Sequence, residues 1–315
     1  MSKVSTTELE EIKSEIRDRI EGYVLSLKIF GTLKRSLERR HLHVHVEKDL
    51  SRLNGTPKCP DLLIEKDNDF LILDNKFIRS TNPKTLESAL DEVGEYDDDF
   101  TLESVTFRPE VALLCPMDAA GMCEQLTQIK YPIVGYLVEK DISLRKIVGS
   151  IRMPIISDLC DPGSHIPIEE EVRRYKFIRQ EAPLPYTAQV VFYILDGLFT
   201  DYFQRDFEVS YEVILDQFNT LFPRWIRNDV YQLTPGRLND ALGFLRSIGW
   251  INWNKESGTI VVDRTKGGRI LDIISHFIDR YAVFLLREKK KKLRETKAER
   301  IVKARPGAKL ENFFQ

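Results

Sequence analysis

The chain has 315 residues, of which 42% are hydrophobic and 30% charged, and its formal net charge is −2. That length suits two domains with apolar cores, and the small net charge means that any polyanion must be bound by local patches rather than by a global field. The four cysteines include no CxxC pair, so we expect neither a disulfide scaffold nor a cysteine-bound zinc or iron–sulfur site. The N-terminus has no signal-peptide run and no stretch reaches ~18 apolar residues, so we expect a cytoplasmic protein without a membrane span.

Residues 6–40 are expected to be helical, because apolar side chains recur at every third or fourth position. Two glycines, Gly22 and Gly31, are expected to divide this segment into two or three pieces. The charged residues fall on the opposite face, as in a helix that lies on a core.

The stretch from His41 to Glu47 alternates polar and apolar residues, which predicts a strand. On such a strand His41, His43, His45 and Glu47 share one face. We interpret this as a polar strand face, because three ligands in line rarely form a tetrahedral site; a zinc or copper site is the alternative.

Two apolar runs, Leu62–Ile64 and Phe70–Leu73, flank a polar connector, which predicts a β-hairpin. Asp74 and Lys76 are two residues apart and leave the same face of their strand, while Asp61 begins the partner strand. The hairpin would therefore bring two carboxylates and one ammonium group together. Carboxylates bind hard cations, which activate water and polarise phosphate, and a lysine stabilises the developing charge.

These residues resemble the motif of the PD-(D/E)XK nuclease superfamily, with Pro60-Asp61 as PD and Asp74-Asn75-Lys76 as (D/E)XK. The resemblance implies a restriction-endonuclease-like fold and a Mg²⁺ site in which Mn²⁺ can replace Mg²⁺. It implies that Asp61, Asp74 and the backbone carbonyl of Asn75 bind the metal, and that Lys76 orients or activates water. A solvated hairpin with an incidental lysine is the alternative.

The resemblance also suggests further site residues, on the helices before and after the hairpin, but these positions fit the superfamily pattern less well. Members of the superfamily often place an extra acidic residue on a preceding helix, where Glu15 and Glu21 are candidates. Some have a Gln-x-x-x-Tyr helix after the lysine, where this chain has Glu92 and Tyr96. Because a glutamate repels phosphate, we interpret these positions as ordinary helix surface.

The order of elements supports an α/β fold with a mixed sheet flanked by helices. After Lys76 we expect a helix from Ser80 to about Asp99, a strand at Val111–Leu114, a helix at Ala119–Ile129 and a strand at Ile133–Val138. This order is similar to that of the nuclease core. We assign residues 1–150 to the nuclease domain and the proline-containing stretch 151–182 to a linker.

Residues 183–265 resemble a winged-helix module, a mostly helical domain that ends in a short hairpin. The resemblance implies a DNA-contacting third helix with Arg237, Asn239 and Arg246 on its polar side, and Lys255 at the tip of the wing. Such modules also bind proteins, and that alternative stays open.

Residues 266–315 are expected to form a helix, a basic segment and a tail. Ten lysines or arginines and three glutamates lie between Arg287 and Arg305. Phosphate contact is one interpretation of this segment and a solvated extension is the other. The phosphate-contact candidates are Lys289, Lys290, Lys291 and Lys292. The tail residues Leu310, Phe313 and Phe314 resemble a sliding-clamp motif that lacks its leading glutamine; docking on another partner or on this chain is the alternative.

The sequence thus predicts a metal-dependent DNA endonuclease. Its biological role could be in restriction or defence, in repair or in mobile-element processing. Double-strand cleavage would require a homodimer or a partner nuclease. Two alternatives remain: a non-catalytic winged-helix DNA-binding or scaffold protein on a nuclease-like fold, and a nuclease that acts on RNA.

Overall fold

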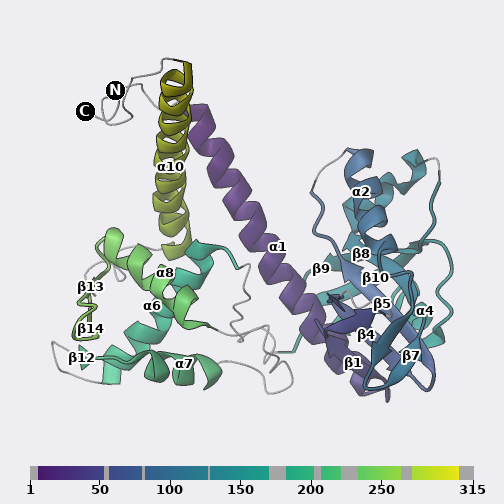
Figure 1. Ribbon diagram of the computed structural model, residues 1–315. Coiled ribbons are helices and arrows are strands. Elements are labelled where there is room, and N and C mark those ends of the chain that lie inside the picture. The colour runs from purple at the N-terminus through teal and green to yellow at the C-terminus, as the bar shows by residue number, and fades with distance from the viewer. Residues whose placement is uncertain are drawn as a thin grey trace. The chain divides into compact units, whose positions relative to one another are not determined.

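The computed structural model describes residues 6–52, 57–79, 82–126, 128–169, 182–201, 207–220, 233–263 and 272–304 (Figure 1). These residues form a mixed α/β structure with a curled mixed sheet flanked by helices, which confirms the expected class. They divide into two compact units. We call the described part of 22–169 the sheet unit, and residues 6–21 with the described part of 182–304 the helical unit.

The sheet unit is built on a seven-stranded sheet of order β1-β4-β5-β8-β9-β10-β11. The pairs β5–β8 and β8–β9 are parallel, and the other pairs are antiparallel. Its strands are β1 (His43–Val46), β4 (Leu62–Lys66), β5 (Asp69–Asn75), β8 (Glu110–Pro116), β9 (Ile133–Val138), β10 (Asp141–Val148) and β11 (Ile166–Pro167).

A second sheet of four short strands belongs to the same unit, in the order β3-β2-β6-β7. These strands are β2 (Leu50–Arg52), β3 (Pro57–Lys58), β6 (Phe100–Leu102) and β7 (Val105–Phe107). The unit's own helices are α2 (Pro83–Gly94), α3 (Met117–Ala120), the 3₁₀ helix η1 (Gly121–Gln125) and α4 (Pro154–Leu159).

The hydrophobic core of the sheet unit fixes the position of α2 (Figure 1). The helix begins after Asn82, whose side chain accepts a hydrogen bond from the Lys84 backbone N–H, and Pro83 occupies its first turn. Its apolar face, including Leu86 and Leu90, packs against sheet residues such as Leu113. Because β5 ends just before α2 begins, this packing places the helix beside the end of β5.

Helix α1 (Thr6–Glu38) is one unbroken helix, so the expected breaks at Gly22 and Gly31 do not occur. Residues 6–21 group with the helical unit and residues 22–38 with the sheet unit. A glycine inside a helix costs only about 1 kcal/mol relative to alanine, which the burial of Leu27, Phe30 and other apolar residues offsets.

The sheet unit includes elements that the sequence interpretation did not contain. Strands β2, β3, β6, β7 and β10 were not expected, and the helix expected at Ala119–Ile129 is replaced by α3 and η1. The stretch interpreted as a linker, 151–182, includes α4 and also β11, which pairs with β10. Pro154 occupies the first turn of α4 and Pro167 lies in an edge strand, so these prolines begin and border structure rather than mark a linker.

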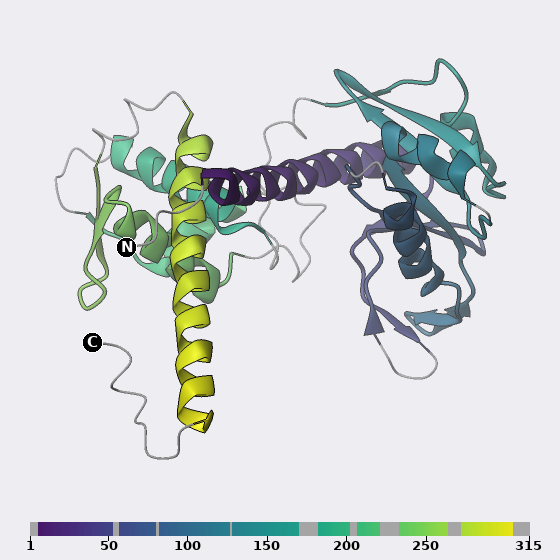
Figure 2. The same ribbon diagram turned by 90° about the horizontal axis from the view of Figure 1, so that it is seen from above.

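The helical unit combines helices with a three-stranded sheet of order β12-β14-β13. Aromatic rings form part of its core: Phe192 and Phe277 each pack edge-to-face on Trp250, with ring centroids 4.9 and 4.7 Å apart. Figure 2 shows α10 extending past the other helices of this unit. Its elements are α6 (Leu184–Asp201), β12 (Phe207–Glu208), α7 (Tyr211–Thr220), α8 (Pro235–Ser247), β13 (Ile251–Trp253), β14 (Thr259–Val262) and α10 (Ile273–Ala304).

Helix α8 begins as expected, because the Thr234 hydroxyl accepts a hydrogen bond from the Arg237 backbone N–H and Pro235 lies at the first turn. The expected hairpin follows it as β13 and β14, and β12 adds a third strand. Helix α10 continues through most of the basic segment, ending at Ala304. No helix within the described residues is long and apolar enough to cross a membrane.

Candidate active site

The β4–β5 hairpin brings Asp61 and Asp74 together. Leu62 pairs with Leu73, so Asp61 and Asp74 lie opposite each other at the end of the hairpin that is farthest from its turn. The Asn75 backbone N–H donates a 2.7 Å hydrogen bond to the Asp61 carboxylate, and the Asp61 backbone N–H donates to the Asp74 carboxylate. These reciprocal bonds hold both carboxylates at one point.

Lys76 completes the expected group. Its Nζ lies 3.0 Å from Asp74 Oδ2 and 2.9 Å from a carboxylate oxygen of Glu92 on α2. The Asp74 side chain is 4% exposed, whereas Lys76 and Glu92 are 31% and 57% exposed. The lysine therefore lies between one buried and one exposed carboxylate, at the border of the site with solvent.

Burial and charge shift the proton equilibria of this group in a consistent way. Burial, followed by the charge of Asp74, raises the pKa of Asp61 to about 8. Burial is also the main cause of the raised pKa of Asp74. Burial acts to lower the pKa of Lys76, but the Asp74 and Glu92 carboxylates outweigh it and raise that pKa above its ordinary value. Lys76 is therefore an ammonium group at neutral pH rather than a ready base.

The donor set fits a hard divalent cation better than zinc. The raised pKa values of Asp61 and Asp74 mean that the ionised forms of these adjacent carboxylates are disfavoured. A bound divalent cation would stabilise both ionised forms. Within the described residues no group of three or more His, Cys, Asp or Glu side chains is placed to hold a metal. A cation at this point would have Asp61 and Asp74 as side-chain ligands, and the Asn75 carbonyl, water and phosphate could supply further oxygens. Mg²⁺ is commonly bound in this way, through one or two carboxylates and substrate oxygens.

We expect Asp61→Asn to raise the melting temperature of the metal-free chain by a few degrees at pH 9. The Asp61 carboxyl loses its proton near pH 3.8 in the unfolded chain but only near pH 8 in the folded chain, because its pKa is raised there. Between these two pH values the folded state therefore binds one more proton than the unfolded state. The free energy of unfolding therefore falls as the pH rises through this window, and asparagine removes that loss. Thermal unfolding in EDTA from pH 5 to 9 measures the gain, which should grow with pH. A gain that is the same at every pH contradicts the prediction.

Magnesium supplies the companion measurement for Asp61→Asn. Mg²⁺ should raise the melting temperature of the wild type, because it binds the folded carboxylates, and should leave that of the variant nearly unchanged. An equal rise in both proteins would place the magnesium elsewhere.

Tyr96, interpreted from the sequence as helix surface, lies beside the carboxylates, as Glu92 does. Its hydroxyl donates a 3.2 Å hydrogen bond to the Cys59 carbonyl. Burial, and then the charges of Asp74 and Asp61, raise the pKa of this hydroxyl. The spacing of four residues between Glu92 and Tyr96 was the available signal, but the register of α2 on the sheet was not deducible from the sequence.

Two further residues of this site were missed. Tyr136 on β9 is 3% exposed, its hydroxyl has no hydrogen-bond partner within the described residues, and its pKa is raised by burial and by the neighbouring Cys115 and Asp61. Ser26 on α1 accepts a 2.7 Å hydrogen bond from the Asn75 side-chain amide and donates to the Gly22 carbonyl. A serine in an apolar helix repeat was the only signal for Ser26.

The histidine strand is shorter than expected. The structure has β1 at His43–Val46, and His45 lies 3.4 Å from a carboxylate oxygen of Glu65 on the neighbouring strand. Glu47 departs from the alternation because its φ is 49°, and its side chain is buried. Its backbone N–H donates a 3.0 Å hydrogen bond to the Asp61 carbonyl. The histidines and Glu47 are therefore not arranged as one continuous row.

The helix acids considered from the resemblance belong to the helical unit. Glu15 lines a pocket of the helical unit, and Glu21 also belongs to that unit. Glu92 is the acidic side chain that the structure adds to the Asp74–Lys76 pair.

The four DNA-contact candidates of the helical unit are not all free. The Arg237 guanidinium donates a 3.0 Å hydrogen bond to the Ala182 carbonyl, and Asn239 accepts one from the Tyr211 hydroxyl. The Lys255 ammonium lies 4.9 Å from the centre of the Trp253 ring, while Arg246 is exposed in the last turn of α8. Internal contacts thus occupy three of these four side chains.

The basic segment presents its lysines unequally. Lys289 forms a 3.0 Å ion pair with Glu8. Lys291 and Lys292 are exposed, and Lys290 is partly buried. The tail residues Leu310, Phe313 and Phe314 lie outside the described residues.

Comparison with family models, curated proteins and solved structures found no match to this chain. The geometry of the site is therefore the basis on which a function is proposed below.

Proposed function

We propose that this chain is a Mg²⁺-dependent nuclease that hydrolyses phosphodiester bonds in DNA. The observation that supports this most strongly is the convergence of Asp61, Asp74 and Lys76 at the end of one hairpin. These are the residues for which the sequence resembles the PD-(D/E)XK superfamily. The carboxylates and the lysine also have the burial and charge balance that this chemistry needs.

In this proposal each residue has a separate role. Asp61 and Asp74 hold the cation, with the Asn75 backbone carbonyl as a further ligand. The bound Mg²⁺ would polarise the phosphate and lower the pKa of the attacking water. Lys76 orients that water and stabilises negative charge on the phosphate as an ammonium group, because its raised pKa disfavours the role of base. Glu92 restrains the lysine through their 2.9 Å contact.

The proposed architecture is a restriction-endonuclease-like sheet unit joined to a winged-helix-like module of α8, β13 and β14. The parallel β5–β8 pair, connected through α2, supports the first half of this proposal. The helix–hairpin order with a third strand supports the second. Arg246 and the exposed Lys291 and Lys292 are the side chains best placed for phosphate contact, since their neighbours have internal partners.

The experiment that tests this function compares three substrates with one preparation of the chain. Supercoiled plasmid, single-stranded DNA and single-stranded RNA are incubated with Mg²⁺ or Mn²⁺, with EDTA as the control. We expect nicked circles as the first product, because one active site cuts one strand and a double-strand break needs a second site. Cleavage of RNA alone would change the substrate class, and cleavage of none of them would reject the proposal.

We expect Lys76→Met to lower the rate of plasmid nicking about a hundredfold with little change in fold. Methionine keeps roughly the length of the side chain but removes the positive charge that would stabilise the transition state. A hundredfold loss of rate is typical when one such electrostatic contact is removed. The measurement is the single-turnover nicking rate at saturating Mg²⁺. Lys66→Met is the matched control, because Lys66 ends β4 at the turn of the same hairpin, far along the strand from Asp61. Equal losses in both variants would contradict the role of Lys76.

A further inference from the structure

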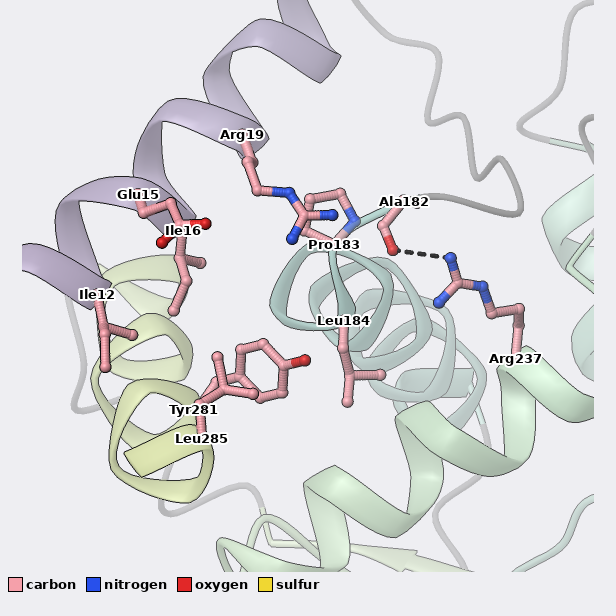
Figure 3. Close-up of a pocket in the computed structure, with 10 residues that line it drawn as sticks. All are labelled: Ile12, Glu15, Ile16, Arg19, Ala182, Pro183, Leu184, Arg237, Tyr281 and Leu285. Carbon is pink, nitrogen blue, oxygen red and sulfur yellow. Dashed lines mark hydrogen bonds between the residues drawn. The ribbon is translucent and has the colours of Figure 1, made fainter. Parts of the chain in front are cut away.

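The helical unit contains a pocket with a volume of about 330 Å³, separate from the Asp61 site (Figure 3). That volume is within the range of small-molecule sites. Its walls are formed by the part of α1 between Ile12 and Arg19, the residues at the start of α6, the first turn of α8 and the first half of α10. It is lined by Ile12, Glu15, Ile16, Arg19, Ala182, Pro183, Leu184, Arg237, Tyr281 and Leu285.

Two guanidinium groups lie at one end of this pocket. Figure 3 shows Arg19 beside Pro183, and Arg237 on the other side of Ala182 with its bond to the Ala182 carbonyl. That 3.0 Å bond uses one of the five N–H donors of the partly buried Arg237. The exposed Arg19 has no hydrogen bond or ion pair within the described residues. Both arginines therefore keep donors for an acceptor in the pocket.

The rest of the pocket is partly polar and partly apolar. The Tyr281 ring packs edge-to-face on Phe244 at 5.9 Å, and its hydroxyl points into the pocket (Figure 3). Glu15 is an exposed carboxylate on the α1 side, one helical turn before Arg19. The apolar walls are Ile12, Ile16, Pro183, Leu184 and Leu285. Two cations, one carboxylate and this apolar surface give the pocket an excess of one positive charge.

We propose that this pocket binds a small organic anion with an apolar body. Its phosphate or carboxylate group lies between Arg19 and Arg237, where planar guanidinium donors match its oxygens. Its apolar body lies against Leu184 and Leu285, and a hydroxyl or amine on that body donates to Glu15. This proposal goes beyond the nuclease site and does not depend on it, since every residue involved belongs to the helical unit.

Four probes test the proposal by isothermal titration calorimetry on the 315-residue chain in EDTA. Phenyl phosphate and phenylacetate carry the two anionic groups on one apolar body, 2-phenylethanol is the neutral analogue, and inorganic phosphate lacks the body. We expect at least one of the two phenyl anions to bind at least about tenfold more tightly than 2-phenylethanol, the size of one charge-assisted contact. The tighter of the two identifies phosphate or carboxylate as the natural group.

Two variants locate the binding. Arg19→Ala should weaken binding of the tighter anion at least about tenfold, whereas Arg17→Ala should change it by less than about twofold. Arg17 is the matched control because it is exposed on the same helix and lines no part of the pocket. Thermal unfolding of both variants checks that the exposed positions leave the fold intact.

Several results would overturn the proposal. Failure of both phenyl anions to bind rejects an anion site. Equal losses in Arg19→Ala and Arg17→Ala indicate general electrostatic attraction instead of this pocket. If 2-phenylethanol binds as tightly as the better phenyl anion, the arginines do not contribute to binding. If inorganic phosphate binds as tightly, the apolar walls do not contribute.

Discussion

Asp74→Asn should reduce Mg²⁺-dependent cleavage of a duplex oligonucleotide about a thousandfold, the largest effect that we expect of a single substitution on activity. Asp74 is a carboxylate of the proposed metal site and also the partner of Lys76, 3.0 Å away. Asparagine keeps the shape and one oxygen but removes the charge that binds the cation and restrains the ammonium group. Single-turnover rates across a Mg²⁺ titration measure the loss, and excess Mg²⁺ should restore only part of it.

The control for Asp74→Asn is Asp69→Asn. Asp69 begins the same strand β5, is exposed, and pairs with Lys66 next to the hairpin turn. This variant removes the same charge from the same strand, and its rate should stay within about twofold of the wild-type rate, as for a surface substitution away from the site. If Asp74→Asn cleaves as fast as Asp69→Asn, the metal site is wrongly assigned.

Gly22→Ala should destabilise the chain by about 1 kcal/mol, the net of the two effects below, and slow cleavage as well. A Cβ at Gly22 would lie 2.3 Å from Phe77 Cδ1 and 2.7 Å from Phe77 Cγ. The ring must move, and overpacking of this kind costs about 1–3 kcal/mol, more than the roughly 1 kcal/mol that alanine gains in helix propensity. Because Phe77 follows Lys76, its displacement also disturbs the lysine. Urea unfolding measures the first effect and plasmid nicking the second.

Gly197→Ala is the matched control for Gly22→Ala. Gly197 lies inside helix α6, and nothing lies within 4 Å of a Cβ built there. The same substitution should therefore stabilise the chain by about 0.5–1 kcal/mol through helix propensity and the unfolded state. Stabilisation by both substitutions would show that α1 and Phe77 are not in close contact.

The sequence predicts the hairpin and the convergence of Asp61, Asp74 and Lys76 well, because local rules determine them. Alternation with a period of two fixes which side chains share a face, and a short polar turn fixes the register, so Asp61 must lie opposite Asp74. The start of α8 is predictable for the same reason, since the Thr234 cap and Pro235 act within one turn. These features need no information about distant parts of the chain.

Tertiary contacts account for what the sequence did not predict. Tyr136 lies near Asp61 only because β9 lies two strands from β5 in the sheet, across β8. Ser26 bonds Asn75 only because α1 packs on the sheet without a break at Gly22. A two-residue strand such as β11 is too short to show an alternating pattern in the sequence. The hydrogen bond from Arg237 to the Ala182 carbonyl joins positions 55 residues apart, so local sequence rules do not predict it.

The most direct test of the proposed active site is plasmid nicking by the wild type and by an Asp61→Asn/Asp74→Asn double variant purified in the same way. We predict that the wild type converts supercoiled plasmid to nicked circles in proportion to added Mg²⁺, that EDTA stops it, and that the double variant is inactive at every Mg²⁺ concentration. Equal nicking by the two proteins, or none by the wild type in Mg²⁺ or Mn²⁺, would contradict the assignment of Asp61, Asp74 and Lys76 as a nuclease centre.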